Sequence, residues 1–191
     1  MTKGKIIVVS APSGAGKTTL LDHLRSEIPG LFYSVSATTR PPRPHEKNGV
    51  HYYFLTREEF RKKIDRNELA EWQEVHGYFY GSPKQAIDDA VNAGRHVIMD
   101  IDVYGKKKFD VSYPDAAGIL VKPPSMEELE RRLRGRGTER EQDVLVRLAN
   151  ARKELDFAET RGKYEYVIVN DSLEWAKQEI VRIVRAVIGL S

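Results

Sequence analysis

Residues 10–19 read SAPSGAGKTT and have the residue types and spacing of a loop that binds phosphate. A short apolar run precedes them and a helical pattern follows, so backbone N–H groups and a helix N-terminus would face the phosphate oxygens. Gly14 and Gly16 permit positive φ angles, Lys17 can reach the β- and γ-phosphates, and Thr18 can ligate Mg²⁺. The usual first glycine is Ala11 here, which is tolerable at a negative φ with its methyl directed away.

An acidic residue that supports a metal is expected on a strand beside such a loop. Asp100 directly follows the apolar residues Val97, Ile98 and Met99. A strand-end aspartate can also cap a turn, but beside a phosphate loop we expect Asp100 to bind Mg²⁺ directly or through water.

Two arginine clusters favour a kinase over a GTPase. Residues 131–140 contain five arginines and residues 38–44 contain two more. Arginine binds phosphate through two parallel hydrogen bonds, and a kinase with a small acceptor needs a second phosphate site and cations that close over the transferred group. Residues 102–105, DVYG, fit a GTPase switch motif by chance, since the chain lacks the Asn-Lys-x-Asp base-reading motif.

The composition of the chain argues against several other classes of protein. The chain has 191 residues, 31 basic against 28 acidic, and no cysteine. This balance argues against nucleic-acid binding, and the absence of cysteine excludes disulfides and thiolate metal sites. No apolar run is long enough to span a membrane or serve as a signal peptide. We therefore expect a cytoplasmic enzyme, either a monomer or a homodimer.

Strand patterns alternating with helical patterns predict an α/β fold with a mainly parallel sheet. Core strands are expected at 5–9, 32–36, 96–101, 118–121 and 166–169, and helices at 17–28, 83–93, 125–134, 141–160 and 173–188. Two stretches break the alternation. Residues 37–80 hold short strand patterns and one helix at 57–67, which predicts a small β-rich lobe, and residues 125–160 predict a helical lid with its following helix. The core domain would then comprise residues 1–36, 81–124 and 161–191.

The motifs SVSATTRPPRP, NGVHYYF, EWQEVHGYFYGS, DIDVYG, RRLRGRGTE and VIVND resemble the guanylate kinases. They occur in the family's order from Ile6 to about Asp171. The resemblance implies a three-layer phosphate-loop fold with a five-stranded parallel core, an inserted GMP-binding lobe and a mobile lid. It also implies transfer of the γ-phosphoryl group of ATP to GMP, with Mg²⁺ as cofactor.

Carried onto this sequence, the resemblance implies a role for each matching residue. The GMP-binding residues would be Ser36, Arg40, Arg43, Tyr52, Glu71, Tyr80, Ser82 and Asp102, with Ser36, Glu71 and Asp102 reading guanine. The ATP-binding residues would be Ala11, Pro12, Ser13, Gly14, Ala15, Gly16, Lys17, Thr18, Thr19, Arg132, Arg136 and Asn170, with Asn170 near the adenine. The catalytic residues would be Lys17, Arg40, Arg132, Arg136 and Arg147.

The chemistry of guanine agrees with this assignment. Its N1–H and exocyclic N2 amine are both donors, and one carboxylate such as Glu71 can accept from both. Adenine would place an acceptor opposite Glu71, and a site built on such hydrogen bonds can reject the wrong partner by about 10⁴-fold.

Several of these residues could instead have purely structural roles. Tyr52 and Tyr80 lie in aromatic runs and could belong to the lobe's core, Glu71 could face solvent, and Arg132 could pair with Glu128 on a solvated helix face. A kinase for AMP, UMP or dTMP and a non-catalytic guanylate-kinase-like interaction module are the rival functions. His45 and His51, both in the small lobe, and Tyr104 depart from residues that are common at these positions in the family.

Overall fold

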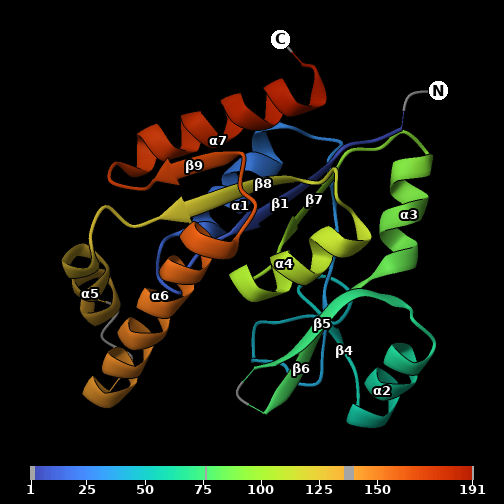
Figure 1. Ribbon diagram of the computed structural model, residues 1–191, viewed down its shortest axis with the longest axis horizontal. Helices are drawn as coiled ribbons and strands as arrows, with labels where there is room; N and C mark the ends of the chain where they lie inside the picture. Colours follow the sequence, from blue (N-terminus) through green and yellow to red (C-terminus); the bar gives the residue numbers. More distant parts are fainter. Residues whose placement is uncertain (1–2, 76, 136–139, 191) are drawn as a thin grey trace.

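The computed structural model describes residues 3–75, 77–135 and 140–190. A five-stranded sheet with the order β2-β7-β1-β8-β9 forms the centre, and every neighbouring pair in it is parallel. Its strands are β1 (Ile6–Ser10), β2 (Phe32–Tyr33), β7 (Val97–Asp100), β8 (Ala117–Lys122) and β9 (Tyr166–Val169). The predicted α/β fold with a five-stranded parallel core is confirmed (Figure 1).

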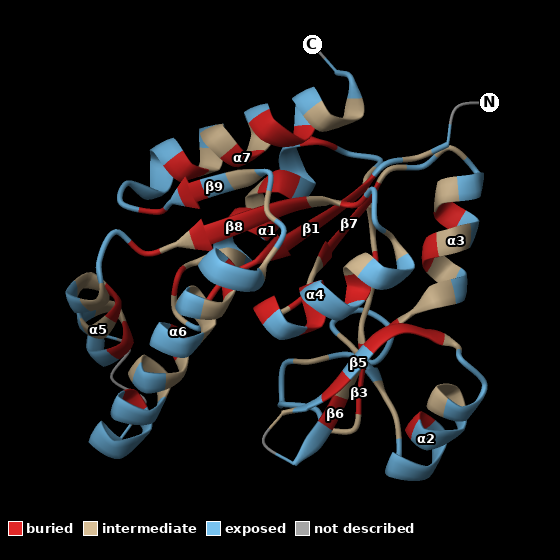
Figure 2. Cartoon of the chain, in the orientation of Figure 1, coloured by how far each residue is buried: buried red, intermediate tan, exposed pale blue. Residues whose placement is uncertain are grey.

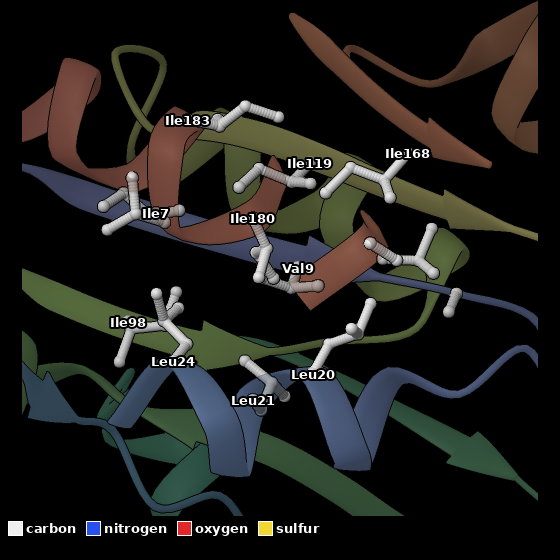
Figure 3. Close-up of a cluster of buried hydrophobic side chains, with 14 of the residues drawn as sticks. Ile7, Val9, Leu20, Leu21, Leu24, Ile98, Ile119, Ile168, Ile180 and Ile183 are labelled. Carbon is white, nitrogen blue, oxygen red and sulfur yellow. The ribbon is translucent and has the colours of Figure 1, made fainter. Parts of the chain in front are cut away.

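Helices cover both faces of this sheet. Those that pack on the core are α1 (Lys17–Glu27), α3 (Lys84–Asn92), α4 (Val103–Ser112) and α7 (Leu173–Ile188). Side chains of α1 and α7 share one buried cluster with alternate residues of the strands, including Ile7, Val9 and Ile98 (Figure 3). The other strand residues face α3 and α4. A parallel strand buried on both faces must be apolar throughout, which explains the continuous apolar runs in the sequence.

The second sheet lies in the small lobe and has the order β4-β3-β6-β5. Its strands are β3 (Ala37–Thr38), β4 (Tyr53–Phe54), β5 (Leu69–Val75) and β6 (Tyr78–Pro83), and α2 (Arg57–Asp65) packs beside them. Helix α2 starts with a capping box formed by Thr56 and Glu59, as this pair of residue types at this spacing predicts. Buried residues are concentrated in the central strands of the core, while the outer surface of the small lobe is largely exposed (Figure 2).

Two helices form the third part of the molecule. They are α5 (Met126–Gly135) and α6 (Glu141–Arg161), which pack together through buried residues that include Leu129, Leu133 and Val144. In Figure 1 they lie on the opposite side of the molecule from the small lobe. Within the described ranges, no helix is long and apolar enough to cross a bilayer.

The sequence analysis missed helix α4 and strands β3 and β6. Helix α4 contains Gly105 and three consecutive lysines, and one of these, Lys106, is fully buried through its ion pair with Asp110, so the helix has no clear apolar stripe. Strand β6 continues to Pro83, so the small sheet extends beyond the predicted lobe boundary at residue 80. In the VHYYF stretch, Val50 and His51 form a turn, Tyr52 makes an isolated β-bridge with Asn48, and Tyr53–Phe54 pair as a strand.

Candidate active site

The phosphate-binding loop joins β1 to α1 at the carboxyl edge of the central sheet. Gly14 and Gly16 have φ angles of 92° and 94°, as expected from the sequence. Ala11 is not among the residues with positive φ, and its methyl belongs to the core cluster with only 8% of the residue exposed. The alanine is therefore compatible with the loop because its side chain packs inward.

Asn170 supports the loop from beneath. Its Nδ2 donates a 2.9 Å hydrogen bond to the carbonyl of Ala15, and the residue is 3% exposed. A Cβ atom at Gly16 would lie 2.4 Å from that Nδ2. The residue implied to lie near adenine is thus packed against the loop backbone, and in this arrangement its amide orders the loop.

Replacing Gly16 by alanine should therefore destabilise the protein and abolish nucleotide binding. The added methyl meets Asn170 at a positive φ, so we expect a loss of unfolding free energy of more than about 2 kcal/mol. Gly30→Ala is the matched control, since Gly30 has a φ of 108° and a Cβ there would meet nothing within 4 Å. It should cost about 1 kcal/mol and leave binding intact. Equal losses in the two variants, measured by denaturant unfolding and nucleotide titration, would contradict the steric account.

Lys17 and Asp100 lie side by side at the ends of the loop and of β7. The Lys17 Nζ is 3.1 Å from an Asp100 carboxylate oxygen, and the Tyr33 hydroxyl donates to the other oxygen. Burial opposes ionisation of Asp100, but Lys17 and Tyr33 outweigh it and keep its pKa below the usual value. Asp100 is therefore an anion facing the loop. Thr18, at the start of α1, lines a cavity beside the phosphate loop together with Lys17 and Asp100.

A second pocket of about 190 Å³ lies beside the loop, between the core and the small lobe. Glu71 lines it and is only 6% exposed. One carboxylate oxygen accepts a 2.8 Å hydrogen bond from the Ser82 hydroxyl, while Oε2 is buried without a partner among the described residues. Burial, with a contribution from Asp102, raises the pKa of Glu71 to about 7. A buried acceptor left unpaired is costly, and this oxygen is available to accept a hydrogen bond from a ligand in the pocket.

Asp102 lines the same pocket and also starts helix α4. Its Oδ1 accepts the backbone N–H groups of Tyr104 and Gly105 at 2.9 and 3.0 Å, which is an N-cap. A Cβ at Gly105 would lie 2.6 Å from Ile101 and 3.0 Å from Glu71 Oε2. The glycine therefore allows the helix to approach the unpaired oxygen of Glu71.

The pocket also contains residues that the sequence analysis did not select. Gln73 and Val75 follow Glu71 along β5 and line the pocket with it. Alternate residues of a strand share one face, so the two-residue period starting from Glu71 could have identified both. Ser36 lies in the pocket as expected.

Tyr52 and Tyr80 meet at the mouth of this pocket. Their rings are 6.1 Å apart in an edge-on arrangement, and both line the pocket. Burial raises the pKa of Tyr52 to about 12, so its hydroxyl stays protonated and can donate.

Arg40 lies over the Tyr52 ring and is bound by Glu46, another residue that the motifs did not single out. Its two terminal nitrogens contact the two Glu46 oxygens at 2.9 and 2.8 Å. The hydrogen bond from Arg40 lowers the pKa of Glu46 to about 2. Arg43 lines the neighbouring cavity beside the phosphate loop.

The cavity beside the phosphate loop has a volume of about 560 Å³ and runs from the loop to helix α6. Arg147 of α6 lines it and donates a 3.2 Å hydrogen bond to the Ser13 hydroxyl. Arg132 instead donates to Glu128 at 2.7 Å on its own helix, so the structure does not bring it to the loop. Arg136 lies outside the described residues. The structure thus gathers the other described site residues around the loop and its neighbouring pocket, with Arg40 beside Tyr52 but paired with Glu46.

A phosphate loop at the carboxyl edge of a parallel sheet, with a buried acidic pocket beside it, defines a phosphate-loop nucleotide-binding protein. The family model for guanylate kinase matches residues 3–187. This chain belongs to the guanylate kinase family.

Individual relatives agree with the family match. A guanylate kinase of Synechococcus sp. (strain JA-3-3Ab) is 48% identical over 94% of this chain and 81% of its own length. One from Thermotoga maritima is 44% identical over 96% of this chain and 87% of its own length. The crystal structure of guanylate kinase from Anaplasma phagocytophilum superposes with a TM-score of 0.76 at 36% identity, covering 98% of this chain and 88% of that one.

Proposed function

We propose that the cleft between the phosphate loop and the small lobe transfers the γ-phosphoryl group of ATP to GMP, giving ADP and GDP. The observation that carries this proposal is the buried, unpaired Oε2 of Glu71 in a pocket next to the phosphate loop. A carboxylate there accepts from N1–H and the N2 amine of guanine, with Ser82 holding its other oxygen. Asp102 and Ser36 line the same pocket and complete the base site.

The phosphate of GMP would bind at the mouth of that pocket. Tyr52 and Tyr80 can each donate one hydroxyl, and Arg43 lies on the side toward the phosphate loop. Arg40 joins them when the GMP phosphate replaces Glu46 as its partner. This exchange keeps the guanidinium paired at every stage, which reduces the cost of binding.

The phosphate groups of ATP would bind the loop backbone from Ser13 to Thr19 and the Lys17 ammonium. The GMP phosphate oxygen then attacks the γ-phosphorus in line. It is already ionised near neutral pH, so the reaction needs no general base. Lys17 and Arg147 stabilise the charge on the transferred group, and Arg132 and Arg136 join them when the lid closes.

Mg²⁺ fits this site on the chemistry of its donors. Magnesium in nucleotide sites uses one or two protein oxygens together with phosphate oxygens and water. Thr18 supplies a hydroxyl, and Asp100 supplies a carboxylate kept ionised by Lys17 and Tyr33. When bound there, the metal would neutralise charge on the β- and γ-phosphates.

Lid closure would require Arg132 to leave Glu128 and turn toward the loop. The Arg132–Glu128 pair is only partly exposed, but it joins residues four positions apart on one helix, and such a pair is individually weak. Its rearrangement adds a conformational step that can limit turnover. The division of the chain into core, GMP lobe and lid stays a prediction, as do the cytoplasmic location, the monomeric or homodimeric state and the use of dGMP.

Two rivals predict different products. A kinase for another monophosphate would phosphorylate AMP, UMP or dTMP, and a non-catalytic module would phosphorylate none. Incubation of ATP with each of five acceptors (GMP, dGMP, AMP, UMP and dTMP), followed by chromatographic measurement of products, should give ADP and GDP in equal amounts with GMP. ADP formation with AMP at a comparable rate, or none with any acceptor, would contradict the proposal.

Glu71 should make GMP binding depend on pH. Its pKa is about 7 in the free protein, and guanine donors favour the ionised form. Protonation below pH 7 therefore competes with binding, and the KM for GMP should rise about tenfold between pH 8 and pH 6. The same titration with Glu71→Gln separates this effect from ionisation of the GMP phosphate. An equal pH dependence in the two proteins would contradict the role of Glu71.

A further inference from the structure

Tyr33 lies at the end of β2, where the chain leaves the core sheet for the small lobe. Its hydroxyl donates a hydrogen bond to Oδ1 of Asp100. The Lys17 Nζ lies 3.1 Å from the other carboxylate oxygen, Oδ2. The carboxylate of Asp100 is thus held at both oxygens, by one group from the phosphate-binding segment and by one group from a strand of the core.

The parallel pairing of β2 with β7 places Tyr33 within reach of Asp100. Tyr33 is opposite Ile98 in the register, and the Ser34 N–H donates to the Ile98 carbonyl at 3.0 Å. Ile98 and Asp100 are two positions apart, so their side chains leave the same face of β7. Two strand residues span about 6.6 Å, a distance that a tyrosine side chain can cover. The hydrogen bond to Asp100 therefore follows from the strand pairing and from the residue type at position 33.

The ring of Tyr33 is fixed independently of its hydroxyl. It packs against the core cluster formed by α1, α7 and the central strands. The guanidinium carbon of Arg25, in the last turn of α1, lies 4.8 Å from the ring centroid, which is within the range of a cation–π contact. Loss of the hydroxyl alone would therefore leave the ring in place, while Asp100 would lose one of its two partners.

The two partners of Asp100 respond differently to ATP. In the proposed reaction, the Lys17 ammonium binds the β- and γ-phosphates, which draws it away from Asp100. The Tyr33 hydroxyl comes from the core sheet, so its hydrogen bond to Oδ1 remains and keeps the carboxylate oriented. Hydrogen bonds to a carboxylate that ligates a metal fix its orientation, and their loss typically costs about 10- to 100-fold in metal affinity or activity.

We propose that Tyr33 is a positioning residue that holds the Asp100 carboxylate in orientation for Mg²⁺ while Lys17 binds the ATP phosphates. The inference rests on the proposed function, because that function places ATP and Mg²⁺ in the cleft. In this role the hydroxyl acts only through Asp100. It therefore changes the affinity for magnesium and leaves the binding of GMP unchanged.

Tyr33→Phe tests this role because it removes the hydroxyl and keeps the ring. Titration calorimetry with ADP measures the metal site without turnover. The variant should need about tenfold more Mg²⁺ than wild type to enhance ADP affinity by half, and its ADP affinity in EDTA should stay within about twofold of wild type. Steady-state rates should show the same shift in magnesium dependence. Excess Mg²⁺ should restore kcat to within about threefold, with the KM for GMP changed by less than about threefold.

Tyr113→Phe is the matched control. The Tyr113 hydroxyl donates to an Asp88 carboxylate oxygen at 2.7 Å, so this substitution removes the same kind of hydrogen bond. Tyr113 and Asp88 line a hollow beside Lys5 and Ile6, at the end of β1 opposite the phosphate loop. Thermal unfolding should show similar losses of stability in the two variants. The magnesium dependence of Tyr113→Phe should equal that of wild type.

A double-mutant cycle with Asp100 separates positioning from a merely structural role. When added to Asp100→Asn, Tyr33→Phe should change the magnesium dependence of ADP binding by less than about threefold. Equal magnesium dependence in Tyr33→Phe and Tyr113→Phe, or a loss of kcat that excess Mg²⁺ does not restore, would overturn the inference.

The two assays also distinguish failure of this inference from failure of the proposed function. If the wild type forms no GDP, the proposed function is wrong, and the ADP titration still tests Tyr33 because it needs no turnover. An active wild type with an unchanged magnesium dependence in Tyr33→Phe overturns the inference alone.

Discussion

Replacement of Lys17 by alanine is expected to lower kcat by about three orders of magnitude while the protein stays folded. Lys17 is the cation of the phosphate loop, and its ammonium lies 3.1 Å from Asp100 at the edge of the cavity. It would neutralise charge on the β- and γ-phosphates in the transition state. Steady-state rates of ADP release at saturating ATP and GMP measure the loss.

The variant also removes the cationic partner of Asp100. The two side chains are 21% and 28% exposed, so water can solvate the remaining carboxylate and the fold should survive. The double variant Lys17→Ala/Asp100→Asn should recover stability without recovering kcat. Lys62→Ala is the matched control, because it breaks an exposed ion pair with Glu58 and should leave kcat unchanged. A near-normal rate in Lys17→Ala would contradict the assigned role of the loop.

Glu71→Gln should lower kcat/KM for GMP by about 10²- to 10³-fold. The side chain keeps its shape and one acceptor oxygen, but its amide nitrogen would face a guanine donor inside a buried pocket. An unsatisfied buried donor costs about 1–3 kcal/mol, to which the lost charge-assisted bond adds. The kcat at saturating GMP should fall less than kcat/KM, since the proposed role of Glu71 is to bind the base and not the reacting phosphates.

Glu74→Gln provides the comparison for this variant. Glu74 lies on the same strand as Glu71 but is exposed, and it forms a 3.4 Å ion pair with Arg57. Its replacement should change kcat/KM for GMP by less than threefold. If both variants lose activity equally, the pocket around Glu71 is not the guanine site.

The central sheet and the phosphate loop were predictable because short stretches of sequence specify them. Strands buried on both faces are continuously apolar, and the phosphate loop has glycines where φ is positive. Helix α4 was not predictable in this way, since its stability comes from tertiary contacts. Lys106 donates to the backbone carbonyl of Lys163, and Ser112 and Lys108 donate to backbone carbonyls of β5.

For the candidate site, the sequence predicted residue types better than their partners. Glu71 was selected, and the structure adds the unpaired oxygen and the shifted pKa, both of which depend on burial by distant segments. Glu46 was not selected because its significance depends on Arg40, its neighbour in space. Arg132 was expected over the loop, but its (i,i+4) partner Glu128 holds it in this conformation.

The ratio of kcat/KM for GMP to that for AMP tests the central claim most directly. Both acceptors carry the same phosphate, so the ratio isolates the base site around Glu71. With ATP as the donor at pH 8, where Glu71 is ionised, we predict a ratio of about 10⁴ or more. A ratio near one would contradict the account.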